Sequence, residues 1–135
     1  MKTVVSSADA PAAIGPYSQA IGAGQLLFCS GQLPTVPKTG DLIGEDVSAQ
    51  ARQVLENMGA VLKAGGSSYA HVVKTTVFLT DLSDFAAMNK VYSEFFPEAS
   101  PADLPFKSLL FQRARRLRLK RSPLNLPEKL CPNRL

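Results

Sequence analysis

Few side chains in this sequence are suited to covalent chemistry or metal binding. The chain has one histidine, His71, and two cysteines, Cys29 and Cys131. Neither a CxxC nor an HxxxH spacing occurs, so the sequence argues against a zinc site. Cys29 lies in an apolar run beside Phe28, and we expect it to be a core residue rather than a nucleophile. His71 opens a β-branched segment and has no charged sequence neighbour, so we expect it to be structural or exposed.

Three other positions have a structural interpretation when the residues are taken alone. Tyr17 follows Gly-Pro, a context typical of a tyrosine that caps a strand with its ring buried. Asn89 lies one helical turn after Phe85, where a polar residue at the edge of a helix is common. Gly31 could serve a close approach between two backbone segments. Taken alone, the residues favour the structural interpretation for Tyr17.

Charge is distributed unevenly along the chain. Residues 1–102 carry six Lys or Arg and nine Asp or Glu, a net charge of −3, whereas residues 103–135 carry nine and two, a net charge of +7. Most of these basic residues lie in the stretch RARRLRLKR at 113–121. Such asymmetry indicates either a nucleic-acid or membrane partner, or an exposed tail without a partner.

Length and composition suit one ordinary domain. A chain of 135 residues can bury one core, and 45% apolar and 19% charged residues are typical of soluble globular proteins. The sequence shows neither an apolar run long enough to cross a membrane nor the apolar core of a secretory signal. We therefore expect no membrane partner. Because two cysteines make no disulfide framework, we expect a reducing compartment and a cytoplasmic protein.

Apolar and turn-forming residues predict four short strands in the first three quarters of the chain. We expect strands at residues 3–7, 17–23 and 25–31, the last two forming a hairpin around the turn signal GAG. A fourth strand, rich in β-branched residues and covered on at least one face, is expected at 71–82. The segment after Asp103 lacks strand-like alternation, so the fourth strand would be left with an open edge.

Two helices are expected between and after these strands. In the first, apolar residues recur on one helical face, Asp46 is placed to cap the start, and Gly65 and Gly66 end it. The second is capped by Asp81 and ends at Pro97. The order β, ββ, α, β, α predicts an α+β domain.

Several motifs follow one another along the chain. They are GPYSQAI, SGQLP, QARQVLENMGAVLKAGG, VVKTTVFLTDLSDFAAMN and, at residues 101–102, PA. In this order they resemble the RidA (YjgF) family of reactive intermediate deaminases, from about residue 2 to Ala102. The resemblance implies a single chorismate-mutase-like α+β domain, with a mixed sheet and two helices on one face. It also implies a homotrimer with three clefts between subunits.

The implied activity is hydrolysis of reactive 2-imino acids to 2-keto acids and ammonia, without a metal or organic cofactor. Such a substrate offers a carboxylate and an electrophilic C=N carbon. A site therefore needs a cation to hold the carboxylate and a placed water to attack the carbon. By the resemblance, the substrate-binding residues of this chain are Tyr17, Ser30, Gly31 and Asn89.

The chain departs from the family where the catalytic charges should be. The family has an arginine for the substrate carboxylate after PA, but this chain has Asp103. The family's two later glutamates, the second of which helps handle the water, fall at Arg118 and Lys120. Charge is inverted at each position, so the catalytic residues stay unassigned. We expect residues 1–102 to form a RidA-like domain, followed by an atypical basic tail at 103–135.

Back-translation suggests how this inversion arose. FKSLLFQRA (residues 106–114), read one base earlier with suitable codons, becomes Phe-Gln-Val-Ala-Ala-Leu-Pro-Lys-Gly, a strand and loop that the family has here. In the same frame residues 103–105 become Arg-Ser-Thr and residues 117–123 become Val-Glu-Ile-Glu-Ala-Ile-Ala, with a stop soon after. Our hypothesis is that one missing base near the codons of Ala102 and Asp103 put the tail out of frame. The tail would then replace the last two strands and impair the hydrolase.

Two alternatives stay open at this point. Some members of the family are described as ribonucleases or translation inhibitors, and the basic stretch 113–121 could contact RNA phosphates. Against this, the stretch itself has no aromatic residue to stack on RNA bases, and only Phe106 and Phe111 lie shortly before it. The other alternative is a non-catalytic trimeric scaffold with a chaperone-like surface.

Overall fold

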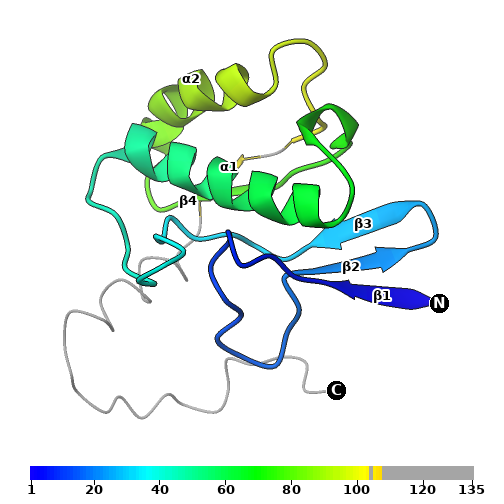
Figure 1. Cartoon of the computed structure of the whole chain (residues 1–135). Helices are drawn as coiled ribbons and strands as arrows, with labels where there is room; N and C mark the ends of the chain where they lie inside the picture. Colours follow the sequence, from blue (N-terminus) through cyan, green and yellow to red (C-terminus); the bar gives the residue numbers. More distant parts are fainter. Residues whose placement is uncertain (104, 108–135) are drawn as a thin grey trace, which may run out of the picture.

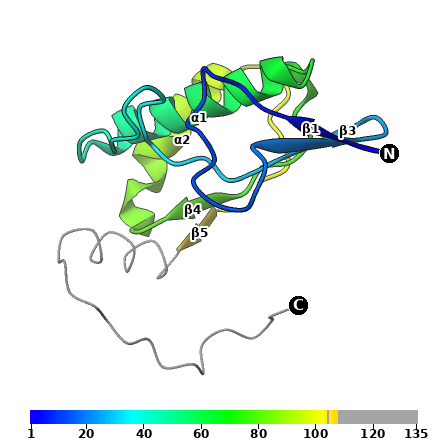
Figure 2. The same ribbon diagram turned by 60° about the horizontal axis from the view of Figure 1, so that its bottom comes forward.

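The computed structural model describes residues 1–103 and 105–107. Its elements are β1 (Lys2–Val5), β2 (Ala20–Ala23), β3 (Leu26–Cys29), α1 (Val47–Ala64), β4 (Val77–Leu79), α2 (Phe85–Phe95) and β5 (Pro105–Lys107). Figure 1 shows α1 running between α2 and the sheet of β1, β2 and β3. In Figure 2 both helices lie on one side and the labelled strands lie below them, as the expected α+β fold requires.

The first three strands form an antiparallel sheet in the order β1-β2-β3. Val4 pairs with Ile21 in β1 and β2, and Ile21 pairs with Phe28 in β2 and β3. The β2–β3 hairpin turns at Gly24, whose φ of 58° lies in the left-handed region that favours glycine. The hairpin predicted around GAG is therefore confirmed.

The fourth predicted strand is shorter than expected. Its first residue, His71, belongs to the 3-10 turn Tyr69–His71, and β4 covers only Val77–Leu79. β4 pairs in parallel with β5, and Lys74 makes an isolated parallel bridge with Ala102. The expectation that no strand follows Asp103 was therefore wrong, since β5 covers one edge of β4. Antiparallel and parallel pairings are both present, but within the described residues they belong to two sheets.

Helix α1 begins and ends where the sequence predicted. The Asp46 carboxylate accepts a 2.7 Å hydrogen bond from the Ala49 amide, which satisfies a free N–H of the first turn. At the other end the Gly65 amide donates to the carbonyl of Val61, and Gly66 follows with a φ of 72°. In the second helical region Asp81 caps a 3-10 turn by accepting from the Ser83 amide, and α2 follows directly.

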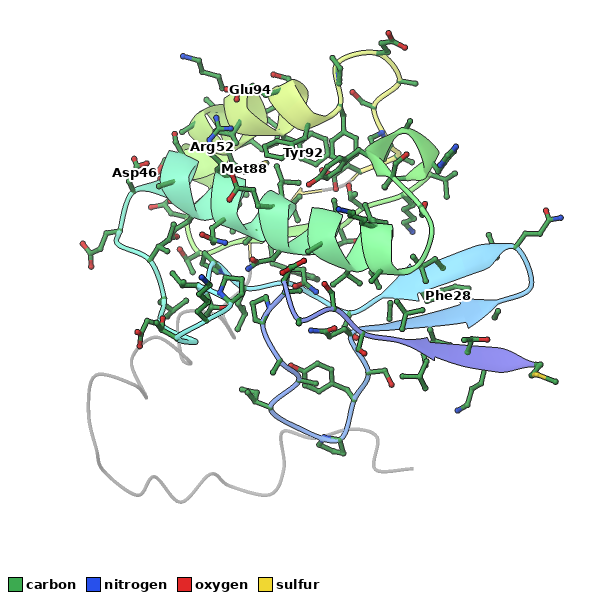
Figure 3. The ribbon with its side chains drawn as sticks, viewed as in Figure 1. Phe28, Asp46, Arg52, Met88, Tyr92 and Glu94 are labelled. Atoms are coloured by element: carbon green, nitrogen blue, oxygen red, sulfur yellow. The ribbon has the colours of Figure 1, made fainter. Side chains whose placement is uncertain are left out.

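The core lies on both sides of α1. One cluster of buried side chains joins α1 to α2 and β4, and its members are Leu55, Leu79, Met88, Val91, Tyr92 and Phe96. A smaller cluster joins α1 to the antiparallel sheet and the N-terminal loop, and its members are Ala10, Ala20 and Val61. Figure 3 shows Met88 and Tyr92 between the two helices, with Arg52 of α1 paired with Glu94 of α2 at the surface. Helix α1 therefore separates two halves of the domain. Neither helix in the described ranges is both long and apolar enough to cross a membrane.

Candidate functional site

Tyr17, Ser30 and Gly31 lie close together on the sheet side of α1. The Ser30 amide donates a 2.9 Å hydrogen bond to the Gln19 carbonyl, and its hydroxyl donates one of 2.6 Å to the Ser18 carbonyl. These two bonds tie the segment after β3 to the segment that follows Tyr17. The structure therefore brings together three of the four predicted substrate-binding residues.

The structural interpretations of Tyr17 and Gly31 are not supported. Tyr17 is 51% exposed, so its ring is not buried as a strand cap. Gly31 is also exposed, and a Cβ added to it would meet no atom within 4 Å, so no close backbone approach requires glycine there. Both positions instead face open space, where a ligand or a second copy of the chain has access.

Asn89, the fourth predicted residue, lies in the other half of the domain. It is an exposed residue of α2, four residues after Phe85 as the sequence indicated. No hydrogen bond in the described part of the chain links Asn89 to Tyr17 or Ser30, and α1 lies between α2 and the sheet (Figure 1). The predicted residues therefore lie on different elements, and we call the two places the Tyr17 half-site and the Asn89 half-site.

Asp103 belongs to the same half as Asn89. It follows Ala102, whose amide donates to the Val73 carbonyl and whose carbonyl accepts from the Thr75 amide at 2.9 Å. The Thr75 hydroxyl is 2.7 Å from that of Tyr92 on α2. Burial raises the pKa of Tyr92, the hydrogen bond with Thr75 lowers it, and the Asp103 carboxylate raises it further. An anion therefore stands near the Thr75–Tyr92 pair, where the family resemblance expects a cation.

The remaining candidates show no sign of a reactive or metal-binding centre. Cys29 is exposed rather than part of the core, because β3 is the last strand of its sheet and no element of the described chain covers it there. Partial burial of its thiol still raises the pKa of Cys29, which disfavours a thiolate. His71 is exposed and 3.3 Å from the Ser68 hydroxyl. Within residues 1–103 and 105–107 there is no cluster of His, Cys, Asp or Glu suited to a metal ion. Arg118, Lys120 and Cys131 lie outside the described residues.

Sequence analysis missed two buried amides behind the first half-site. Gln19 has four hydrogen bonds to the N-terminal loop, and Asn57 of α1 has three hydrogen bonds, two of them to the loop after β3. A signal for Asn57 was present, because it lies three residues after Val54 and four before Val61 on an otherwise apolar helical face. A buried polar residue on such a face needs partners, and here they are loop carbonyls.

A family model, curated relatives and solved structures all match most of this chain. Residues 7–110 match the model of the family described as Endoribonuclease L-PSP. A RutC family protein of Pyrococcus horikoshii is 54% identical over 102 residues, which cover 76% of this chain and 81% of that protein. The 2-iminobutanoate/2-iminopropanoate deaminase of Salmonella typhimurium is 49% identical over 108 residues, covering 80% and 83%. Among solved structures, Escherichia coli TdcF with bound serine is 41% identical with a TM-score of 0.75, covering 78% of this chain and 85% of that chain.

Proposed function

Because this chain belongs to the Endoribonuclease L-PSP family, also known as RidA or YjgF, we propose that its site is that of a hydrolytic 2-imino acid deaminase, impaired by its tail. The family function is supported by relatives named as deaminases, such as the Salmonella enzyme. The observation that carries the impairment is the place of Asp103. It follows the bridge between Lys74 and Ala102 and lies near the Thr75–Tyr92 pair, in the half of the domain that holds Asn89.

The effect of Asp103 on an imino acid follows from its charge. Two unit charges 4 Å apart in water interact by about 1 kcal/mol. Replacing a cation by an anion loses that attraction and adds an equal repulsion, a change of about 2 kcal/mol before bidentate hydrogen bonds are counted. Since 1.4 kcal/mol is tenfold in affinity, a carboxylate substrate should bind more than tenfold more weakly. Without a held carboxylate, the C=N carbon is not oriented toward a water.

The two half-sites are best joined by a second copy of the chain, and we propose a homotrimer with clefts between subunits. Tyr17 lies in the loop before β2 and Asn89 lies on α2, and α1 runs between α2 and the antiparallel sheet (Figure 1). The open face of the antiparallel sheet also exposes Val4, Leu26 and Phe28, at 65%, 58% and 59%. Adjacent exposed apolar side chains of this kind mark protein interfaces. An assembly that covers them would bring one copy's Tyr17 half-site toward another's Asn89 half-site.

The test compares the chain as written with a chain that carries the frame-corrected tail. Both are purified, and 2-keto acid release from 2-iminobutanoate is measured at equal subunit concentration, with oligomeric state from light scattering. We expect turnover by the corrected chain and at least tenfold less by the chain as written. Sequencing the gene across codons 102 and 103 checks the missing base directly.

Two single variants separate charge from the loss of strands. Asp103→Asn removes the anion and Asp103→Arg supplies the cation, while both keep the rest of the tail. If the charge dominates, Asp103→Arg should recover more activity than Asp103→Asn. If the chain as written turns over the imine as fast as the corrected chain, the proposed impairment is wrong.

An RNA-binding function is the second candidate, favoured by the net charge of +7 over residues 103–135 and by the endoribonuclease name of the matching family. Binding through phosphate contacts weakens steeply as salt is raised. RNA affinity that falls with salt and is lost on removing residues 108–135 would support this function. Equal affinity with and without these residues would exclude the basic tail as an RNA site.

A further inference from the structure

Asn57 is a buried amide whose hydrogen bonds connect α1 to the loop that follows Ser30 and Gly31. Its residue is 1% exposed, although it lies on the surface of a helix. Its Nδ2 group donates to the carbonyls of Leu33 at 3.1 Å and Thr35 at 2.9 Å. Both N–H bonds of one amide are thus used on one short loop. Asn57 therefore fixes the distance between that loop and the helix.

The acceptor oxygen of Asn57 is also occupied. Gln53, one turn earlier on α1, donates to Asn57 Oδ1 at 2.9 Å. This bond orients the Asn57 amide so that its nitrogen faces the loop. A buried amide with three bonds made is costly to replace, because each lost donor leaves a carbonyl without its partner.

Gln19 makes the matching connection on the other side of Ser30. Its side chain has four hydrogen bonds to the N-terminal loop, among them donation to the carbonyls of Pro11 at 2.8 Å and Ser7 at 3.1 Å. Its own backbone carbonyl accepts the Ser30 amide at 2.9 Å. The Gln19 segment is therefore hydrogen-bonded to Ser30 itself. Asn57 is hydrogen-bonded to the loop that follows Ser30 and Gly31.

We propose that Asn57 is a positioning residue that sets the place of the Ser30–Gly31 segment relative to Tyr17 in the substrate-binding half-site. The expected effect on substrate binding rests on the proposed function. That Asn57 holds the loop at Leu33 and Thr35 does not depend on that function. Asn57 is 1% exposed and therefore out of reach of a ligand in solution, so it acts only through the loop. Removing its two donors frees the loop at Leu33 and Thr35 while the helix and sheet stay in place.

The test measures amide hydrogen exchange by NMR in the full chain and in Asn57→Leu, which removes both donors at similar volume. The Ile43 amide, bonded to the Pro34 carbonyl, and the Ser30 amide report on the segment, and amides of α1 serve as the internal reference. Each lost hydrogen bond is expected to speed exchange roughly tenfold. We therefore expect Ile43 and Ser30 to exchange at least tenfold faster relative to α1 in the variant.

Two further variants make the result specific. Asn57→Ala also lacks the donors and has a smaller side chain, so it should reproduce the loop effect even if Asn57→Leu folds poorly. Val91→Ala, in the core of α2 and away from this loop, should lower protection throughout without changing the ratio. The proposal is overturned if both Asn57 variants keep the parental ratio within twofold. It is equally overturned if Val91→Ala changes the ratio as much as they do.

Kinetics link the loop to the proposed function. In the chain with the corrected tail, Asn57→Leu should raise KM for 2-iminobutanoate more than tenfold, whereas Val91→Ala should leave KM within twofold. An unchanged KM in Asn57→Leu with altered exchange would overturn the positioning role. If the corrected parent shows no turnover, the proposed function fails, and the exchange experiment alone still decides whether Asn57 holds the loop.

Discussion

Replacing Gly59 by alanine should destabilise the domain, although alanine is the better helix former. Gly59 lies inside α1, where the side chain of Tyr69 comes directly against it. A Cβ added at Gly59 would meet the Tyr69 hydroxyl oxygen and lie 2.7 Å from Cζ. That hydroxyl donates a 2.6 Å hydrogen bond to the Leu55 carbonyl, and the ring packs edge-on against Phe95 and Phe96. The ring therefore cannot move away without losing these contacts.

The size of the effect follows from two destabilising contributions and one stabilising contribution. Overpacking a well-filled site costs about 1–3 kcal/mol. Losing the hydrogen bond to the Leu55 carbonyl costs about 1 kcal/mol more. Alanine returns about 1 kcal/mol of helix propensity over glycine. We therefore expect the free energy of unfolding to fall by about 1–3 kcal/mol, which at about 4 °C per kcal/mol lowers Tm by roughly 4–12 °C.

The assay is thermal and urea unfolding, followed by circular dichroism, of Gly59→Ala, Tyr69→Phe and the double variant. Tyr69→Phe removes the oxygen that the new methyl group would meet. In this background Gly59→Ala should cost at least about 1 kcal/mol less, a coupling that a double-mutant cycle isolates. The reasoning is refuted if Gly59→Ala raises stability in the parent, or if its cost is the same in both backgrounds.

Two other predictions concern a helix cap and alkaline pH. Asp46→Ala removes the acceptor of the Ala49 amide and should lower stability by about 1 kcal/mol, whereas Asp46→Asn should cost much less, as urea unfolding can show. Burial raises the pKa of both Tyr69 and Tyr92 above the ordinary value of 10.0, so the folded state keeps phenol protons that the unfolded state has lost. This contribution is complete below about pH 10 and is lost as pH rises through the folded pKa values. Tm should therefore fall above pH 10, and less steeply in Tyr69→Phe and Tyr92→Phe; equal slopes in parent and variants would contradict this.

Local signals in the sequence were sufficient for the helices and the hairpin. Helix α1 has a capping aspartate, an apolar face and a glycine pair at its end, and each acts within a few residues. The hairpin turn depends on Gly24 in the left-handed region. These features need no distant partner, so periodicity and turn chemistry predict them directly.

Burial was predicted less well, because it depends on what covers each face. Cys29 was expected in the core from its apolar neighbours, and Tyr17 was expected to bury its ring when taken alone. Both are exposed, since Cys29 is the final residue of β3, the last strand of its sheet, and Tyr17 lies in the loop before β2. Strand β5 was missed for a related reason. Three residues that pair with β4 across a long sequence separation carry no periodicity of their own.

The division of the site into two halves explains how much of it the sequence could predict. Ser30 is hydrogen-bonded to the carbonyls of Gln19 and Ser18, which keeps it close to Tyr17 within one chain; that these residues bind substrate stays a prediction. Asn89 lies on α2, and α1 runs between α2 and the antiparallel sheet (Figure 1). In the cleft between two copies that we propose, Asp103 would act from the Asn89 side on a substrate held from the Tyr17 side. The fold of residues 1–103 can thus stay intact while binding is lost, because the changed charge lies at the rim of one half-site rather than in the core.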